Sequence, residues 1–103
     1  MHQVIAEKKQ EIARICRRHD VRRLEVFGSA ARATDFDPAR SDVDFLVEFQ
    51  PPLVARLLER FLNLQDDLQG VMGRQVDLIR DGTIHNPYRM ASIDEDREVV
   101  FET

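Results

Sequence analysis

The amino-acid sequence predicts an α/β (α+β) domain in which a small mixed sheet is flanked by helices. Segments with apolar residues at helical spacing alternate with short segments rich in β-branched and aromatic residues, and Gly or Pro stands near several of their boundaries. A chain of 103 residues fits one domain, because most domains contain about 100 to 150 residues. We therefore expect a single domain over residues 1–103.

The first elements follow from apolar spacing and from turn residues. Apolar residues recur at three- and four-residue steps between charged ones, which predicts an amphipathic helix over residues 3–19. Residues 21–27 predict a buried strand that ends at Gly28. A short helix is expected to begin at Ser29, because serine suits a helix cap and good helix formers follow it. Residues 34–41, with two aspartates and a proline, predict a loop.

The next strand is expected over residues 42–49, where side chains alternate between two faces and Pro51 follows. One face carries four apolar residues and the other carries Asp42, Asp44, Leu46 and Glu48. Later elements are predicted from the same signals: a helix over residues 53–71, a strand over 75–80, a helix over 88–95 and an added edge strand over 99–101.

Composition excludes several classes of function. Hydrophobic residues make up 43% of the chain and charged residues 33%, which suits a small core under a charged surface. A net charge of -4 argues against general nucleic-acid binding, which needs clustered Lys and Arg. No apolar run approaches the roughly 20 residues of a membrane span, and the first residues lack the apolar core of a signal peptide, so we expect a cytoplasmic protein without membrane contact. Cys16 is interpreted as a small buried hydrophobe.

Three aspartates are the candidate catalytic and metal-binding residues. Asp42 and Asp44 are separated by one residue, so both carboxylates are expected on one face of a strand, about 6 to 7 Å apart at Cα. Asp77, in the next strand along the chain, is the candidate third ligand. Mg²⁺ prefers carboxylates together with phosphate oxygens, and two ions held by such acids can activate an attacking oxygen and neutralise a leaving phosphate.

The candidate nucleotide-binding residues lie where the first strand ends. Gly28 lets the backbone approach a phosphate closely, and Ser29 offers a hydroxyl beside the free N–H groups of a helix start. Arg32 lies one turn into that helix, where it either contacts a phosphate or braces one of the acids, and the sequence leaves both roles open.

Other polar residues have a structural interpretation that competes with a functional one. Tyr88 is expected to pack at a helix start, with acceptance of a nucleotide by the chain itself as the alternative. Asp35 and Asp37 are typical turn formers that could also supplement a metal site. His85 is expected at the surface.

Three segments together resemble a known family. The sequence FGSAAR over residues 27–32, SDVDFLV over residues 41–47 and GRQVDLI over residues 73–79 resemble the signature of the minimal nucleotidyltransferase (MNT) group within the polymerase beta-like nucleotidyltransferase superfamily. The resemblance covers nearly the whole chain and implies the nucleotidyltransferase fold. It implies Mg²⁺ or Mn²⁺ at Asp42, Asp44 and Asp77, with the triphosphate of ATP at Gly28 and Ser29. Ala33 stands where many members have glycine, which would stiffen the loop.

The resemblance also implies a biological role. Short members are commonly encoded beside a helical HEPN protein, as an antitoxin that transfers AMP from ATP to a tyrosine of its HEPN toxin. Two alternatives stay open: an antitoxin that neutralises its partner by binding alone, and nucleotidyl transfer to a small molecule with an acceptor site on another subunit. Because the chain is small and its helices have apolar faces, a homodimer or hetero-oligomer is also conceivable.

Overall fold

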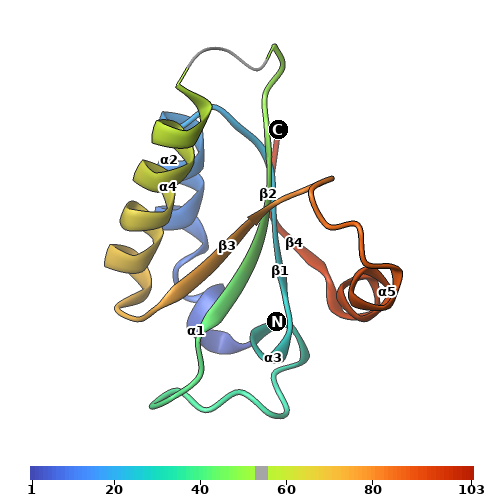
Figure 1. Ribbon diagram of the computed structural model, residues 1–103. Coiled ribbons are helices and arrows are strands. Elements are labelled where there is room, and N and C mark those ends of the chain that lie inside the picture. Colours follow the sequence, from blue (N-terminus) through green and yellow to red (C-terminus); the bar gives the residue numbers. More distant parts are fainter. Residues whose placement is uncertain (53–55) are drawn as a thin grey trace.

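The computed structural model describes residues 1–52 and 56–103, and it contains a four-stranded mixed sheet with helices on both faces (Figure 1). The strands lie in the order β3-β2-β1-β4, with bounds Val21–Phe27 for β1, Val43–Phe49 for β2, Val76–Arg80 for β3 and Glu98–Glu102 for β4. β1 pairs antiparallel with both β2 and β4, whereas β2 and β3 are parallel. The predicted fold class is therefore confirmed, including β4 as an edge strand.

Two long helices cover one face of the sheet. α2 (Lys9–Arg18) and α4 (Leu57–Met72) lie side by side there (Figure 1). The alternation predicted for β2 is confirmed, because its four apolar residues on this side join the main core. β1 reaches the same core with both Val21 and Leu24, which strict alternation would place on opposite faces; a register shift after Val21 makes this possible. Cys16 is buried among these side chains, and burial raises the pKa of its thiol to about 12.

The predicted helix over residues 3–19 is wrong in its continuity. The structure has a single turn, α1 (Gln3–Ala6), then a break at residues 7–8 before α2 begins. The His2 ring accepts a hydrogen bond from the Val4 N–H and caps α1, while the His2 backbone N–H donates to the Ala30 carbonyl. The break lets the first turn bend away from α2 toward the end of β1, a tertiary contact that overrides local helical spacing.

The remaining helices differ from expectation mainly at their ends. α4 begins at Leu57, and residues 53–55 of the predicted helix lie outside the described residues. Of the two glycines near the predicted end of this helix, Gly70 and Gly73, it is Gly73 that ends α4, in a left-handed conformation with φ 64°. α3 (Ser29–Arg32) is one turn long, and α5 (Pro87–Asp96) begins with Pro87 after an Asn86 side chain that accepts hydrogen bonds from two backbone N–H groups.

The second face of the sheet is mostly polar. α5 covers part of it (Figure 1), above a small apolar cluster formed by Phe27, Leu46 and Ile93. The rest carries charged side chains from β1, β2 and the segment after β3. Nowhere in residues 1–52 and 56–103 is a helix both long and apolar enough to cross a membrane.

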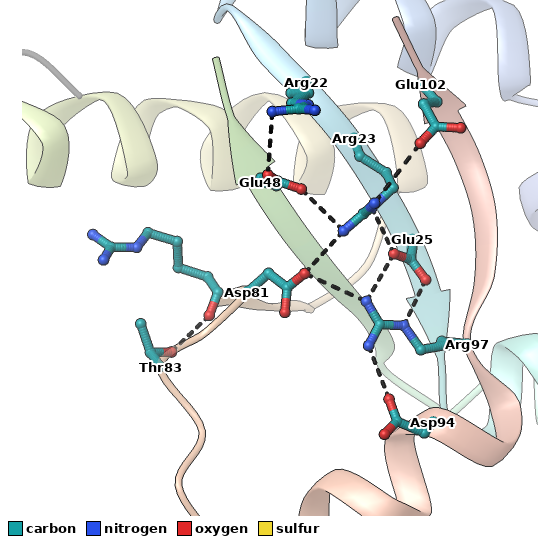
Figure 2. A network of polar contacts seen from close by, with 10 residues as sticks. Arg22, Arg23, Glu25, Glu48, Asp81, Thr83, Asp94, Arg97 and Glu102 are labelled. Atoms are coloured by element: carbon teal, nitrogen blue, oxygen red, sulfur yellow. Dashed lines mark hydrogen bonds and ion pairs between the residues drawn. The ribbon is translucent and has the colours of Figure 1, made fainter. Parts of the chain in front are cut away.

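Much of that polar face is occupied by a set of ion pairs, here called the charged network: Arg23, Glu25, Glu48, Asp81 and Arg97 (Figure 2). Glu25 lies at its centre and is only 6% exposed. Arg97 donates from Nε to Glu25 Oε2 at 2.7 Å and from Nη2 to Oε1 at 2.9 Å, while Arg23 Nε lies 2.8 Å from Oε1. These hydrogen bonds raise the pKa of Arg97 further above its usual value. The buried carboxylate is thus matched by two guanidinium groups.

Candidate active site

The three predicted acids gather where β2 and β3 begin. In the parallel pairing of these strands Asp44 lies directly opposite Asp77, so the two side chains leave the same face about 5 Å apart at Cα. Asp42 precedes the first residue of β2 and is exposed, as is Asp77, whereas Asp44 is half-buried. Asp44 and Asp77 are therefore closer at Cα than Asp42 and Asp44, the pair on which the sequence prediction rested.

Electrostatic strain in this acid group is concentrated on Asp44. Burial of its carboxyl raises its pKa to about 6, and the negative charges of Asp77 and then Asp42 add to the rise. Arg89 and Arg32 act in the opposite direction without cancelling the shift. A site that holds excess negative charge is prepared to receive a cation or a cation-bound phosphate.

Gly28 is required here for a reason that differs from the expected one. Its backbone has φ 70° and ψ -152°, a conformation available to glycine and disfavoured for other residues. A Cβ at this position would lie 2.5 Å from Asp44 Oδ2. The missing side chain therefore makes room for the carboxylate of a neighbouring strand, where the sequence suggested room for a phosphate.

The short helix after Gly28 is weaker than expected as an anion-binding element. α3 has four residues, and the backbone N–H groups of Ala31 and Arg32 both donate to the Gly28 carbonyl. One turn contributes only a small dipole. Ser29 is partly exposed at its start, and the turn ends at Ala33 with φ 67°, the left-handed conformation that glycine adopts without cost.

Arg32 is engaged by acids outside the predicted set. Its Nε and Nη2 donate to the Asp35 carboxylate, with a shortest distance of 2.7 Å, and its Nη1 donates to Asp96 Oδ2 at 2.5 Å. These bonds raise the pKa of Arg32 and lower that of Asp35. Asp37 closes a turn by accepting from the Ala39 N–H. The turn-forming interpretation of Asp37 holds, and Asp35 is an ion-pair partner of Arg32.

α5 supplies residues that the sequence interpretation missed. Arg89, Ser92, Ile93 and Asp96 line one side of a cavity of about 170 Å³ whose other side comes from the end of β1 and from α3. Nothing in the local pattern signals this, because the contact depends on where the chain returns after β3. Tyr88, expected to pack at the helix start, is 87% exposed, so that prediction was wrong. His85 is exposed, as expected.

The donor chemistry of Asp42, Asp44 and Asp77 fits a hard divalent cation, since all three are carboxylates whose mutual repulsion a cation would relieve. As the side chains stand, the described residues contain no three Asp, Glu, His or Cys groups gathered closely enough to hold an ion. Two of the three carboxylates are exposed, so ordinary side-chain rotation is open to them.

Comparison with known proteins identifies the family. The family model described as Nucleotidyltransferase domain matches residues 9–100. The chain belongs to this nucleotidyltransferase family. Two proteins of Methanocaldococcus jannaschii that carry the name "Putative protein adenylyltransferase" are 35% and 37% identical to it over 94 residues, which is 84% of this chain and 91% of each relative.

Solved structures agree with this nucleotidyltransferase assignment at the level of the fold. A "putative minimal nucleotidyltransferase" superposes with a TM-score of 0.73 at 26% identity and covers 95% of both chains, which supports the resemblance to the MNT group. A chain of a toxin-antitoxin crystal structure with AMP-PNP gives 0.68 at 18% identity over 92% of this chain and 73% of that one. A chain from a complex of tri-AMPylated Shewanella oneidensis HEPN toxin with MNT antitoxin gives 0.65 at 15% identity, covering 96% and 73%.

Proposed function

We propose that this nucleotidyltransferase transfers AMP from ATP to a hydroxyl of a partner protein, a tyrosine of a HEPN toxin, and so acts as its antitoxin. The observation that carries the chemistry is the Asp44 and Asp77 pair on adjacent strands, in which the Asp44 carboxylate packs against Gly28 and Asp77 is exposed. Support for the acceptor class comes from the names of the M. jannaschii relatives, and support for the partner comes from the toxin-antitoxin neighbours.

The proposed reaction requires little covalent chemistry from the protein. The acceptor oxygen bonds to the α-phosphorus of ATP, the bond from that phosphorus to the oxygen bridging to the β-phosphate breaks, and pyrophosphate leaves with the electron pair. Asp77, the more exposed of the paired acids, takes the hydroxyl proton as a general base. Mg²⁺ or Mn²⁺ bound by Asp42, Asp44 and Asp77 would neutralise charge on the triphosphate and on the leaving pyrophosphate.

The open surroundings of the acids suit a protein acceptor. Asp42 and Asp77 are both exposed to solvent. A partner that presents its hydroxyl at this edge of the sheet would complete the active centre, which would give a hetero-oligomer a catalytic purpose.

The test is label transfer from α-³²P ATP to a co-purified partner in the presence of Mg²⁺. We expect Asp77→Ala to lower the transfer rate by about a thousandfold or more, in the range typical for loss of a catalytic group. Asp66→Ala is the matched control, because Asp66 is an exposed carboxylate on α4 and is remote from the acids. Transfer by Asp77→Ala at the control rate would reject the proposed mechanism, and an antitoxin acting by binding alone would then be favoured.

A further inference from the structure

The charges on α5 run against the direction that stabilises a helix. Peptide dipoles favour acidic side chains in the first turn and basic ones in the last. α5 has Arg89 in its first turn and Asp94, Glu95 and Asp96 in its last, with no acid at the start and no base at the end. A sequence that breaks a local rule usually does so for a contact made elsewhere in the fold.

Contacts with neighbouring elements explain the acidic end of α5. Asp96 accepts a hydrogen bond from Arg32 of α3, and Asp94 pairs with Arg97, which in turn holds the buried Glu25 of β1. The last turn of α5 is thereby attached to two separate elements. These contacts hold α5 in a defined position, and they thereby also fix where its first turn lies.

The basic end of α5 lies beside the acid group. Arg89 lines the same cavity of about 170 Å³ as Gly28 and Arg32. The Asp44 carboxylate packs against Gly28, and the positive charge of Arg89 lowers the pKa of Asp44 more than that of Arg32 does. The cavity thus has the Arg89 guanidinium in its lining, and the Asp44 carboxylate lies next to Gly28 of the same lining. Such an arrangement suits a cation-bound triphosphate.

The two arginines of this cavity differ in what their donors already bind. Arg32 is occupied by Asp35 and Asp96, as described above. Arg89 is exposed, and its side chain forms no hydrogen bond or ion pair with any group in residues 1–52 and 56–103. The guanidinium with donors to spare is thus the one that the sequence interpretation did not select.

We infer that Arg89 is a nucleotide-binding residue that donates hydrogen bonds to the β- or γ-phosphate of the triphosphate, with α5 as the second wall of the nucleotide pocket. A planar guanidinium can bind two phosphate oxygens at once, which suits a group with several free donors. The inference rests on the proposed function, because it takes a nucleoside triphosphate as the ligand. It also gives the reversed charge order of α5 a physical reason.

A competing role for Arg89 is to offset the charge of Asp44 without touching the nucleotide. The two roles predict different changes in ligand affinity when the arginine is removed. A contact to the β- or γ-phosphate affects ATP and leaves AMP unaffected, because AMP lacks those phosphates. A general electrostatic effect changes the binding of both ligands together.

The experiment is titration calorimetry of the intact chain with ATP and with AMP at one fixed Mg²⁺ concentration. Arg89→Gln should weaken ATP binding by about tenfold to a hundredfold, the range for a charge-assisted hydrogen bond, and change AMP binding by less than about twofold. Arg89→Lys should recover part of the ATP affinity, since it restores the charge without the planar fork. Arg14→Gln, at an exposed arginine on α2, is the matched control and should bind ATP like the wild type.

Three results would overturn the inference. ATP affinity in Arg89→Gln within twofold of the wild type would do so, as would equal losses for ATP and AMP. Both leave the proposed function intact if the wild type still transfers label to its partner. A wild-type chain that binds no ATP at all would remove the proposed function and the inference together.

Discussion

Two groups of carboxylates share the polar face of the sheet, and they are treated in opposite ways. In the charged network, Glu25, Glu48 and Asp81 are matched by two arginines (Figure 2). In the acid group, Asp44 lies beside Asp77 with Asp42 close by, and the nearby arginines leave its pKa raised.

On this one face of the sheet, the charged network stabilises the fold, whereas the acid group forms the candidate site. A matched carboxylate is held by donors that satisfy it, so the charged network ties α5 to β1 and adds order to the fold. An unmatched carboxylate reduces the stability of the fold at neutral pH, and groups with such shifted pKa values cluster at functional sites. The position of the arginines thus distinguishes the acids that stabilise the fold from the acids that the proposed function uses.

The largest effect is expected from removing a matched partner. Arg97→Ala should lower the free energy of unfolding by about 3 kcal/mol, because Glu25 would stay buried with Arg23 as its remaining partner. Urea denaturation followed by circular dichroism measures this, with Arg14→Ala as a control expected within about 0.5 kcal/mol of the wild type. If Arg97→Ala lowered the free energy of unfolding by less than about 1 kcal/mol, Arg23 alone would satisfy the buried Glu25. The contrast between the charged network and the acid group would then be weaker.

A smaller effect of opposite sign is expected from the unmatched acid. The Asp44 carboxyl has a folded-state pKa of about 6, above its unfolded value of about 4. Below pH 4 the carboxyl of Asp44 is protonated in both the folded and the unfolded state. Between pH 4 and 6 the folded state holds this proton more tightly than the unfolded state does. The free energy of unfolding therefore falls as the pH rises through this window. At pH 7, Asp44→Asn should stabilise the protein by about 1 to 2 kcal/mol, after allowance for partial exposure.

The stabilisation by Asp44→Asn should disappear at pH 4, where the wild-type group is also neutral. Thermal unfolding at pH 4 and pH 7 without divalent cations tests this, with Asp66→Asn as the control for an exposed acid. A destabilised Asp44→Asn variant at pH 7 would show that the carboxylate is satisfied in the fold, contrary to the distinction between the two groups.

The smallest effect concerns backbone strain next to the candidate active site. Ala33 has φ 67°, so Ala33→Gly should stabilise the protein by about 1 kcal/mol. Ala39→Gly, in the same loop but without a positive φ, should give no gain. Chemical denaturation distinguishes the two variants, and equal effects would remove the argument from strain. The gain should leave the charged network untouched, since neither residue contacts it.

Much of the fold follows from local patterns in the sequence. The alternation in residues 42–49 placed its apolar residues in the main core and Asp44 on the opposite face, as the structure confirms. The strand from Gln75 was predicted to within one residue, and the end of α4 at Gly73 follows from its left-handed conformation. Such features depend on residues that are close together in the chain, so the sequence alone predicts them.

The features that were missed depend on distant contacts. The break before α2 arises from the docking of His2 on Ala30, and the binding of Arg32 to Asp96 joins residues 64 positions apart. Residues 21–27 suggested an ordinary buried strand, although Glu25 inside it is paired both with Arg23 of the same strand and with Arg97, which returns to it from the far end of α5. The roles of the three aspartates and of Gly28 and Ser29 in catalysis and nucleotide binding stay predictions, which the proposed experiments address.

The attachment of α5 by residues so distant in sequence also has a consequence for timing. Glu25 and Arg97 are 72 positions apart, and Asp77 reaches Asp44 only after the whole of α4 has been built between their strands. Contacts of such long separation form late, because the intervening chain must first be ordered. A chain emerging from the ribosome therefore lacks its paired acids until β3 has been synthesised, and it lacks the α5 wall of the cavity until α5 has been synthesised and has docked. Both parts of the candidate site are thus completed only near the end of synthesis.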